Sequence, residues 1–224
     1  MNPVVMNRQC HTVQRARSAF AERGPALWTR MRRSFFLIAA LCWATAASAV
    51  EVGGAVIPDT AHLSAEGPEL VLNGAGERRI MLFKIYAIGL YLPARRNTMS
   101  EVLALKGPKR LLLVIQRSEL SGKQIHDYLI SRIGDGTQQD EMAAMKARMD
   151  ELDSIINAER SIKRGGTIAL DYIPEQGTVI RVNGVAKGAP IPGDDFYHAL
   201  LKIWLGERAK SATLREALLG RGTS

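Results

Sequence analysis

The chain has 224 residues, of which 46% are hydrophobic and 23% are charged, so it has the size and composition of one globular domain, or two small ones, and not of a disordered chain. Only one apolar run is long enough to suggest a membrane segment, which excludes a protein with several membrane spans. The formal net charge is +8, but it is unevenly distributed: residues 1–49 hold seven arginines and a single acid, Glu22, whereas the remaining residues hold 23 basic and 21 acidic side chains. Because a nucleic-acid-binding surface needs a basic stripe, this near-neutral body argues against nucleic acid as a partner.

The first 49 residues have the layout of a secretory leader. Met31-Arg32-Arg33 is a short basic region, residues 35–45 (FFLIAALCWAT) are apolar, and Ala47-Ser48-Ala49 is a small-residue cleavage motif. The apolar run is shorter than the ~20 residues of a spanning helix. We therefore expect a signal peptide over about 31–49, cleavage near Ala49, and a periplasmic or secreted protein with no stable membrane span, with an uncleaved N-terminal anchor as the alternative. Residues 1–30 are then either upstream of a true start at Met31 or part of an unusually long basic region.

Residues 50–224 offer no cysteine chemistry and no recognisable cofactor motif. Cys10 and Cys42, the only cysteines, both lie in the leader, so we expect neither a disulfide nor a reactive thiolate after cleavage. Gly74-Ala75-Gly76 lacks the third glycine of a dinucleotide site, and the histidines do not have metal-ligand spacing. We expect no metal and no cofactor, and we assign no catalytic residue.

The first half of this region predicts three strands and one helix. Residues 69–73 predict a short strand that the glycines at 74–76 end. Residues 80–92 (IMLFKIYAIGLYL) form a nearly unbroken apolar run, which predicts a long central strand covered on both faces. Residues 98–105 predict a short helix and residues 109–116 another strand.

The second half predicts helices and one clear hairpin. Ser121 and Gln124 form a capping-box pattern before a helix that ends near Ile133, and apolar residues at helical spacing predict a second helix within 138–160. Residues 167–173 and 178–182 predict paired strands, and Asn183-Gly184 predicts a type I′ turn. Two more helices are predicted, over 194–205 with Asp194 as N-cap and over 211–219 with Ser211 as N-cap. These elements predict a single α+β domain over residues 50–224 with a mainly antiparallel sheet.

Several segments resemble the chalcone isomerase family. LNGAGERR (72–79) followed by FKIYAIGLYLP (83–93) is similar to the family's glycine-rich turn with an arginine that leads into a strand, and LKIWLGER (201–208) is similar to its C-terminal helix. The loop IPGDDF (191–196) resembles that of bacterial secreted members. The resemblance implies an open-faced sandwich, in which a layer of α-helices covers one face of an antiparallel sheet with a ligand cleft between them.

The resemblance implies binding more strongly than catalysis. The enzymes of the family use an arginine, two threonines and a tyrosine–asparagine pair, whereas fatty-acid-binding members hold a carboxylate with the arginine and a nearby hydroxyl. The arginine corresponds to Arg78, the strand threonine to Tyr86 and the helix threonine to Ile203, and the tyrosine–asparagine pair has no match near residues 134–140. Loss of these donors should remove most of the advantage of oriented attack.

The residues themselves also favour an anionic ligand. A guanidinium at an apolar cleft stays charged and matches a carboxylate bidentately. Tyr86 on the next strand can donate a further hydrogen bond, and Lys84, expected on the same strand face as Tyr86, is a third candidate. The alternative is structural: Arg78 or, more readily, Arg79 pairs with Glu77 or Glu69 at a solvated turn, and Tyr86 belongs to the core.

We thus predict a periplasmic protein that binds a fatty acid or similar amphipathic carboxylate without catalysis, through Arg78, Tyr86 and Lys84. Two alternatives stay open, namely an isomerase of the intramolecular-lyase type with an unknown substrate, and a ligand-free interaction protein of the cell envelope. The sequence leaves the ligand's identity and the oligomeric state open.

Overall fold

The structure is a computed structural model that describes residues 48–136 and 139–222. Residues 47–224 form one compact unit. Nearly all of the predicted signal peptide lies outside the described residues, so it stays a prediction.

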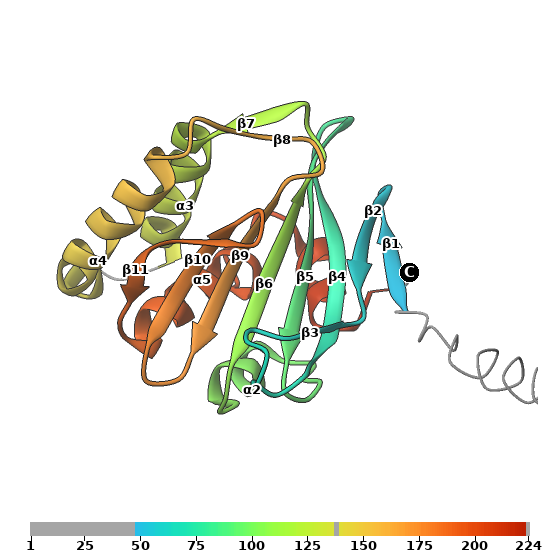
Figure 1. Cartoon of the computed structure of the whole chain (residues 1–224), viewed down its shortest axis with the longest axis horizontal. Helices are drawn as coiled ribbons and strands as arrows, with labels where there is room; N and C mark the ends of the chain where they lie inside the picture. The colour runs from blue at the N-terminus through green and yellow to red at the C-terminus, as the bar shows by residue number, and fades with distance from the viewer. Residues whose placement is uncertain (1–47, 137–138, 223–224) are drawn as a thin grey trace, which may run out of the picture. The chain divides into compact units, whose positions relative to one another are not determined.

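A seven-stranded antiparallel sheet organises the domain, with the strand order β11-β10-β9-β6-β5-β4-β3 (Figure 1). Its strands are β3 (Thr60–Ala61), β4 (Leu70–Ile80), β5 (Phe83–Leu92), β6 (Lys109–Ile115), β9 (Thr167–Ile173), β10 (Gly177–Val182) and β11 (Val185–Ile191). Two further pairs join β1 (Ala49–Val52) to β2 (Ala55–Pro58) and β7 (Glu119–Ser121) to β8 (Ser161–Lys163). The predicted α+β class with a mainly antiparallel sheet is therefore confirmed.

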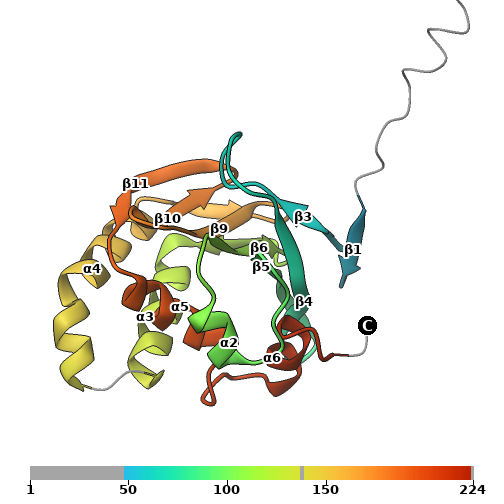
Figure 2. The same cartoon turned by 90° about the horizontal axis from the view of Figure 1, so that it is seen from below.

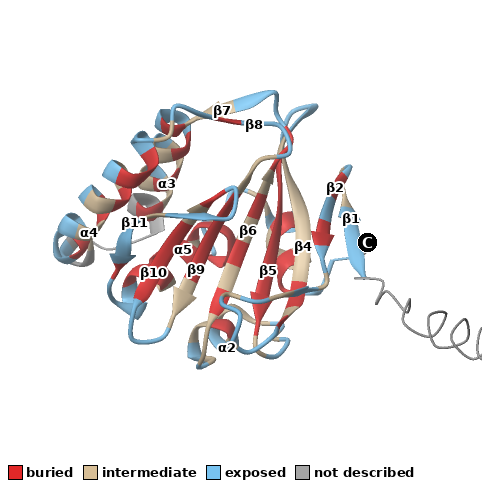
Figure 3. Ribbon diagram, in the orientation of Figure 1, coloured by how far each residue is buried: buried red, intermediate tan, exposed pale blue. Residues whose placement is uncertain are grey.

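The helices gather on one face of the curled sheet (Figure 2). They are α2 (Met99–Ala104), α3 (Gly122–Gly136), α4 (Gln139–Asn157), α5 (Asp194–Leu205) and α6 (Ala212–Leu218). The main core fills the space between the helices and the sheet, and buried residues follow the central strands in Figure 3. A smaller cluster, which includes Ile57, Leu72 and Tyr91, packs the β1–β2 hairpin against the opposite face.

The glycine-rich segment at 74–76 is part of a strand, so the prediction that it ends the strand is wrong. Strand β4 continues through Gly74 and Gly76 to Ile80. Helix α6 packs directly on this segment: a Cβ at Gly76 would lie 2.7 Å from Leu214 Cδ1, and one at Gly74 would overlap the Ala217 carbonyl. The glycines therefore allow a close approach between helix and strand.

The apolar run at 80–92 is divided by a tight turn, so the prediction of one long covered strand is wrong for its first residues. Ile80 ends β4, Met81 and Leu82 form the turn, and Phe83 begins β5. Only from Tyr86 onward is the strand continuously buried. A turn made of apolar residues carries none of the glycine, asparagine or proline signals that mark turns in a sequence.

Three of the predicted helix starts can be compared with the observed caps. Ser121 Oγ accepts from the Gln124 N–H at 3.2 Å and Gln124 Oε1 accepts from the Ser121 N–H at 3.0 Å, which confirms the capping box. Ser211 Oγ accepts from the Leu214 N–H at 3.2 Å, as predicted. Asp194, however, is the first helical residue of α5 and Gly193 is its N-cap.

Candidate functional site

An apolar cavity of about 180 Å³ lies beneath the helix-covered face of the sheet. Strands β4, β5, β6 and β9 form one side, and α3 and α5 contribute the other. Most of the side chains that line it are aliphatic, and a few are polar. The lining residues are Arg78, Ile80, Ile85, Tyr86, Leu113, Ile115, Arg117, Leu120, Gln124, Ile125, Tyr128, Leu129, Ile168, Leu170 and Trp204. A cavity with an apolar body and a few convergent polar groups is typical of a small-molecule site.

Arg78 enters this cavity from β4. It is paired directly with Tyr86 of β5, and such opposite residues project from the same face with their Cβ atoms about 4.5–5.5 Å apart. Arg78 is half-buried, and no hydrogen bond or ion pair joins it to another residue within 48–136 or 139–222. The guanidinium charge is thus left without a compensating partner beside an apolar space, where a charge is costly unless it is paired.

Tyr86 belongs to a short chain of hydrogen bonds at the polar end of the cavity. The indole N–H of Trp204 donates to Tyr86 Oη at 2.9 Å, and the Tyr86 hydroxyl donates to Tyr128 Oη at 3.4 Å. Burial, reinforced by Tyr128, raises the pKa of Tyr86 well above its ordinary value. Tyr86 therefore stays neutral at physiological pH and retains a proton to donate.

Tyr128 and Trp204 were not among the residues predicted from the sequence. Tyr128 lies on the same helix face as Gln124 and Ile125, which also line the cavity, so helical spacing was an available signal. Trp204 immediately follows Ile203, the position that corresponds to a family threonine. Each looked like an ordinary residue of an amphipathic or apolar helix, and only the tertiary structure brings them to Arg78.

Lys84 does not join Arg78 and Tyr86 in this cavity. The β4–β5 register pairs Arg78 with Tyr86 but Arg79 with Lys84, so one extra residue, Ile85, is inserted in β5. Such a bulge reverses the alternation of side chains. The Lys84 ammonium donates instead to the Gly53 carbonyl at 2.7 Å, in the turn of the β1–β2 hairpin. The expectation that Lys84 shares a face with Tyr86 is wrong.

Arg79 pairs with Glu77, as the structural alternative predicted for it. The two neighbouring arginines are thus distinct: Arg79 is exposed and neutralised by a carboxylate, whereas Arg78 is half-buried at the cavity. This contrast makes Arg79 a natural control for Arg78.

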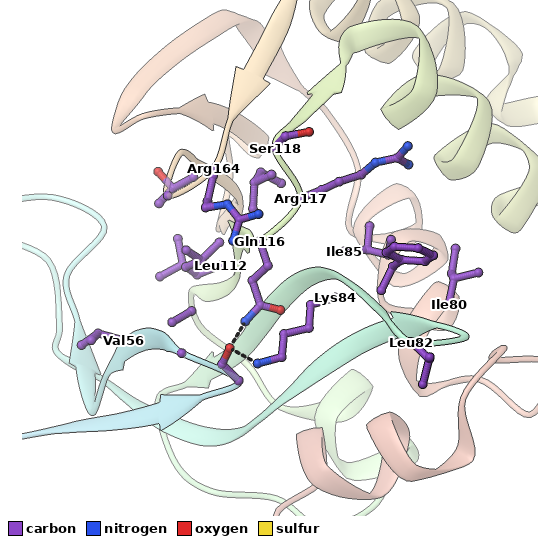
Figure 4. Close-up of a pocket in the computed structure, with 18 of the residues that line it drawn as sticks. Val56, Ile80, Leu82, Lys84, Ile85, Leu112, Gln116, Arg117, Ser118 and Arg164 are labelled. Carbon is purple, nitrogen blue, oxygen red and sulfur yellow. Dashed lines mark hydrogen bonds between the residues drawn. The ribbon is translucent and has the colours of Figure 1, made fainter.

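A larger groove of about 1160 Å³ lies between the β1–β2 turn and the end of the sheet. Figure 4 shows the side chains around it, among them Leu82, Arg117 and Arg164. Gln116 Nε2 donates to the Gly53 carbonyl at 3.0 Å, beside the bond from Lys84, so these polar groups already have partners. The groove shares Ile80, Ile85, Ile115 and Arg117 with the smaller cavity, which places the two on either side of one wall.

The described part of the chain offers neither a metal-binding cluster nor a membrane-spanning helix. It contains no group of three or more histidine, cysteine, aspartate and glutamate side chains that could hold a metal ion. None of its helices has both the length and the apolar character needed to cross a membrane.

The fold and the cavity together define an α+β open-faced sandwich with a basic residue at the head of an apolar space. The family model for chalcone isomerase-like proteins matches residues 49–220, and the chain belongs to this family. A solved structure of a fatty-acid binding protein from Arabidopsis thaliana shares the fold with a TM-score of 0.60 at 18% sequence identity. The match covers 77% of this chain and 96% of that one. No match is found among curated proteins.

Proposed function

We propose that this protein binds a fatty acid or a similar amphipathic carboxylate, without catalysis, in the cavity headed by Arg78. The observation that carries the proposal is the half-buried guanidinium of Arg78, which has no hydrogen-bond or ion-pair partner among the described residues and belongs to the residue paired with Tyr86. A carboxylate would accept two parallel hydrogen bonds from such a guanidinium and would neutralise its charge. The alkyl tail would lie among the aliphatic side chains of β5, β6, β9 and α3.

The hydroxyl chain suits this role. Trp204 already donates to Tyr86 Oη, so the Tyr86 proton remains available for an acceptor. Its present acceptor, Tyr128 Oη, is at 3.4 Å, which is long for a bond between hydroxyls. A carboxylate oxygen at Arg78 would therefore accept a shorter, charge-assisted hydrogen bond from the Tyr86 hydroxyl.

The comparisons support a lipid ligand in coarse terms. The Arabidopsis neighbour is a fatty-acid binding protein with the same fold. The chemistry of this chain also favours binding over ring closure, because Ile203, which corresponds to the family's helix threonine, is a buried aliphatic side chain that donates no hydrogen bond. We further propose that the protein is exported and acts in the periplasm or outside the cell, on the basis of the leader-like residues 31–49.

The proposal is tested by titrating the delipidated segment 47–224 with octanoate in a calorimeter. Loss of a charge-assisted hydrogen-bond pair is worth about 1.5–3 kcal/mol, so Arg78→Ala should weaken binding roughly 10- to 100-fold. Arg79→Ala, which removes an exposed and ion-paired neighbour, should leave the affinity unchanged. Equal affinity of the Arg78→Ala variant and the unmodified segment would overturn the site, and absence of binding to any chain length would overturn the function.

A further inference from the structure

The turn between β4 and β5 exposes four consecutive apolar side chains. Ile80, Met81, Leu82 and Phe83 are 53%, 88%, 89% and 71% exposed. The hairpin end projects beyond the neighbouring strands of the sheet, and Figure 3 shows it as exposed. Runs of this kind are rarely left in water, and where they occur they mark contact with a partner or a membrane.

The backbone conformation of the turn does not explain why these residues are apolar. Met81 has φ = 54°, in the left-handed region that glycine and asparagine adopt most easily. The chain uses that solution elsewhere, since Asn183 and Gly184 form the β10–β11 turn with φ values of 50° and 81°. At the β4–β5 turn an apolar side chain is retained in spite of the backbone cost, which indicates a role for the side chain itself.

Cationic side chains line the groove beside this apolar tip. Arg117, Arg164 and Lys84 line the same groove as Leu82 and Phe83 (Figure 4). Arg117 and Arg164 are exposed, and neither forms an ion pair with any residue that the structure describes. In a lipid bilayer the apolar acyl chains lie next to anionic headgroups. An exposed apolar tip next to unpaired cations matches this arrangement, because the tip suits the acyl chains and the cations suit the headgroups.

The tip also adjoins the proposed ligand site. Ile80 and Arg117 line both the groove and the cavity that contains Arg78. A surface that the tip contacts would therefore lie next to the cavity.

We propose that residues 80–83 dock the protein on a lipid bilayer with anionic headgroups, with Leu82 and Phe83 at the acyl boundary and Arg117 and Arg164 on the phosphates. A bilayer fits better than a protein partner because the apolar residues form a narrow protrusion. Such a protrusion can insert at any point of a fluid bilayer, whereas a protein partner would need a pocket of matching shape. The further idea that docking lets a lipid-derived acid enter the cavity rests on the proposed function.

Vesicle flotation of the segment 47–224 tests the docking. We expect the protein to float with vesicles of phosphatidylcholine and phosphatidylglycerol, and about tenfold less with phosphatidylcholine alone. Leu82→Asp should abolish flotation, whereas Val185→Asp, at the 61% exposed first residue of β11 next to another turn, should not change it. Arg117→Gln combined with Arg164→Gln should remove the preference for anionic vesicles, and the exposed Lys106→Gln at the other end of β6 should preserve it.

Absence of flotation with anionic vesicles, or equal flotation of the Leu82→Asp and Val185→Asp variants, would overturn the docking. Thermal melts establish that the variants are folded, and Leu82→Ser replaces Leu82→Asp if the charge itself destabilises the hairpin. Octanoate titration in solution separates the two proposals: intact octanoate binding without flotation overturns docking alone, whereas flotation without any fatty-acid binding overturns the proposed function alone.

Discussion

Trp204 donates its indole N–H to the hydroxyl of Tyr86 at 2.9 Å, and so joins α5 to β5 across 118 positions of the sequence. Both groups are buried, with exposed fractions of 2% and 5%. Because the hydroxyl oxygen accepts from Trp204, its own proton points elsewhere, toward Tyr128 and the end of the cavity that Arg78 lines. The pair orients the one hydroxyl that lies directly across the strands from the guanidinium.

Tyr86→Phe should weaken both the fold and the ligand complex. The Trp204 N–H would be left buried without an acceptor, which costs about 1–3 kcal/mol in the free energy of unfolding, and octanoate would lose one hydrogen bond, or about 2- to 10-fold in affinity. Urea unfolding and calorimetric titration measure the two effects. Tyr172→Phe is the matched control, since Tyr172 contacts the Tyr197 ring and does not line the cavity. Equal losses in both variants would contradict the assigned role of Tyr86.

The cavity volume predicts a preference for short acids. At about 180 Å³ it is smaller than the ~300–1,000 Å³ of most ligand pockets, so we expect octanoate to bind more tightly than palmitate. Leu129→Ala enlarges the cavity and should shift the preference toward palmitate, at a cost of about 2–5 kcal/mol in stability.

Leu201→Ala is the control for this shift. Leu201 is as deeply buried as Leu129 but does not line the cavity, so its removal should destabilise the protein by a similar amount and leave the chain-length preference unchanged. A palmitate preference in the unmodified protein would show that the cavity opens further when ligand binds.

Buried tyrosines predict a loss of stability at alkaline pH. Tyr91 donates to the Pro58 carbonyl at 2.8 Å and Tyr197 to the Leu170 carbonyl at 3.1 Å. Burial raises the pKa of both tyrosines above the ordinary value. In the unfolded chain they ionise near pH 10, so above that pH the unfolded state binds fewer protons than the folded state. The contribution of these tyrosines to the free energy of unfolding should therefore be constant below about pH 10 and fall above it.

Urea unfolding on either side of pH 10 measures this dependence. Tyr91→Phe lowers stability at every pH, because a hydrogen bond is lost, but it should make the alkaline decline less steep. A free energy of unfolding that stays constant through this pH range would contradict the prediction.

The sequence was sufficient for the fold class, because strand alternation, caps and turn residues act over short distances. The choice of Arg78 and Tyr86 came from the family resemblance, and the structure pairs the two residues across β4 and β5. The glycines at 74 and 76 misled the prediction of where the strand ends. Their role is to let α6, a helix about 140 positions away along the chain, pack closely against β4. The sequence was also misleading at Met81, where an apolar residue occupies a turn. Tyr128 and Trp204 were not predicted as site residues. Helical spacing indicates that each lies on a buried helix face, but it does not indicate which cavity that face lines.

The single residue inserted at Ile85 keeps the Lys84 side chain out of the ligand site. With the insertion, Lys84 turns to the β1–β2 hairpin, and Arg78 is the one cation that β4 and β5 turn toward the Tyr86 hydroxyl. One further residue in β4 between Arg78 and Arg79, opposite Ile85, would restore regular pairing and bring the Lys84 ammonium to the same side as the Arg78 guanidinium. The bulge at Ile85 therefore limits the positive charge that this hairpin presents to an anionic headgroup.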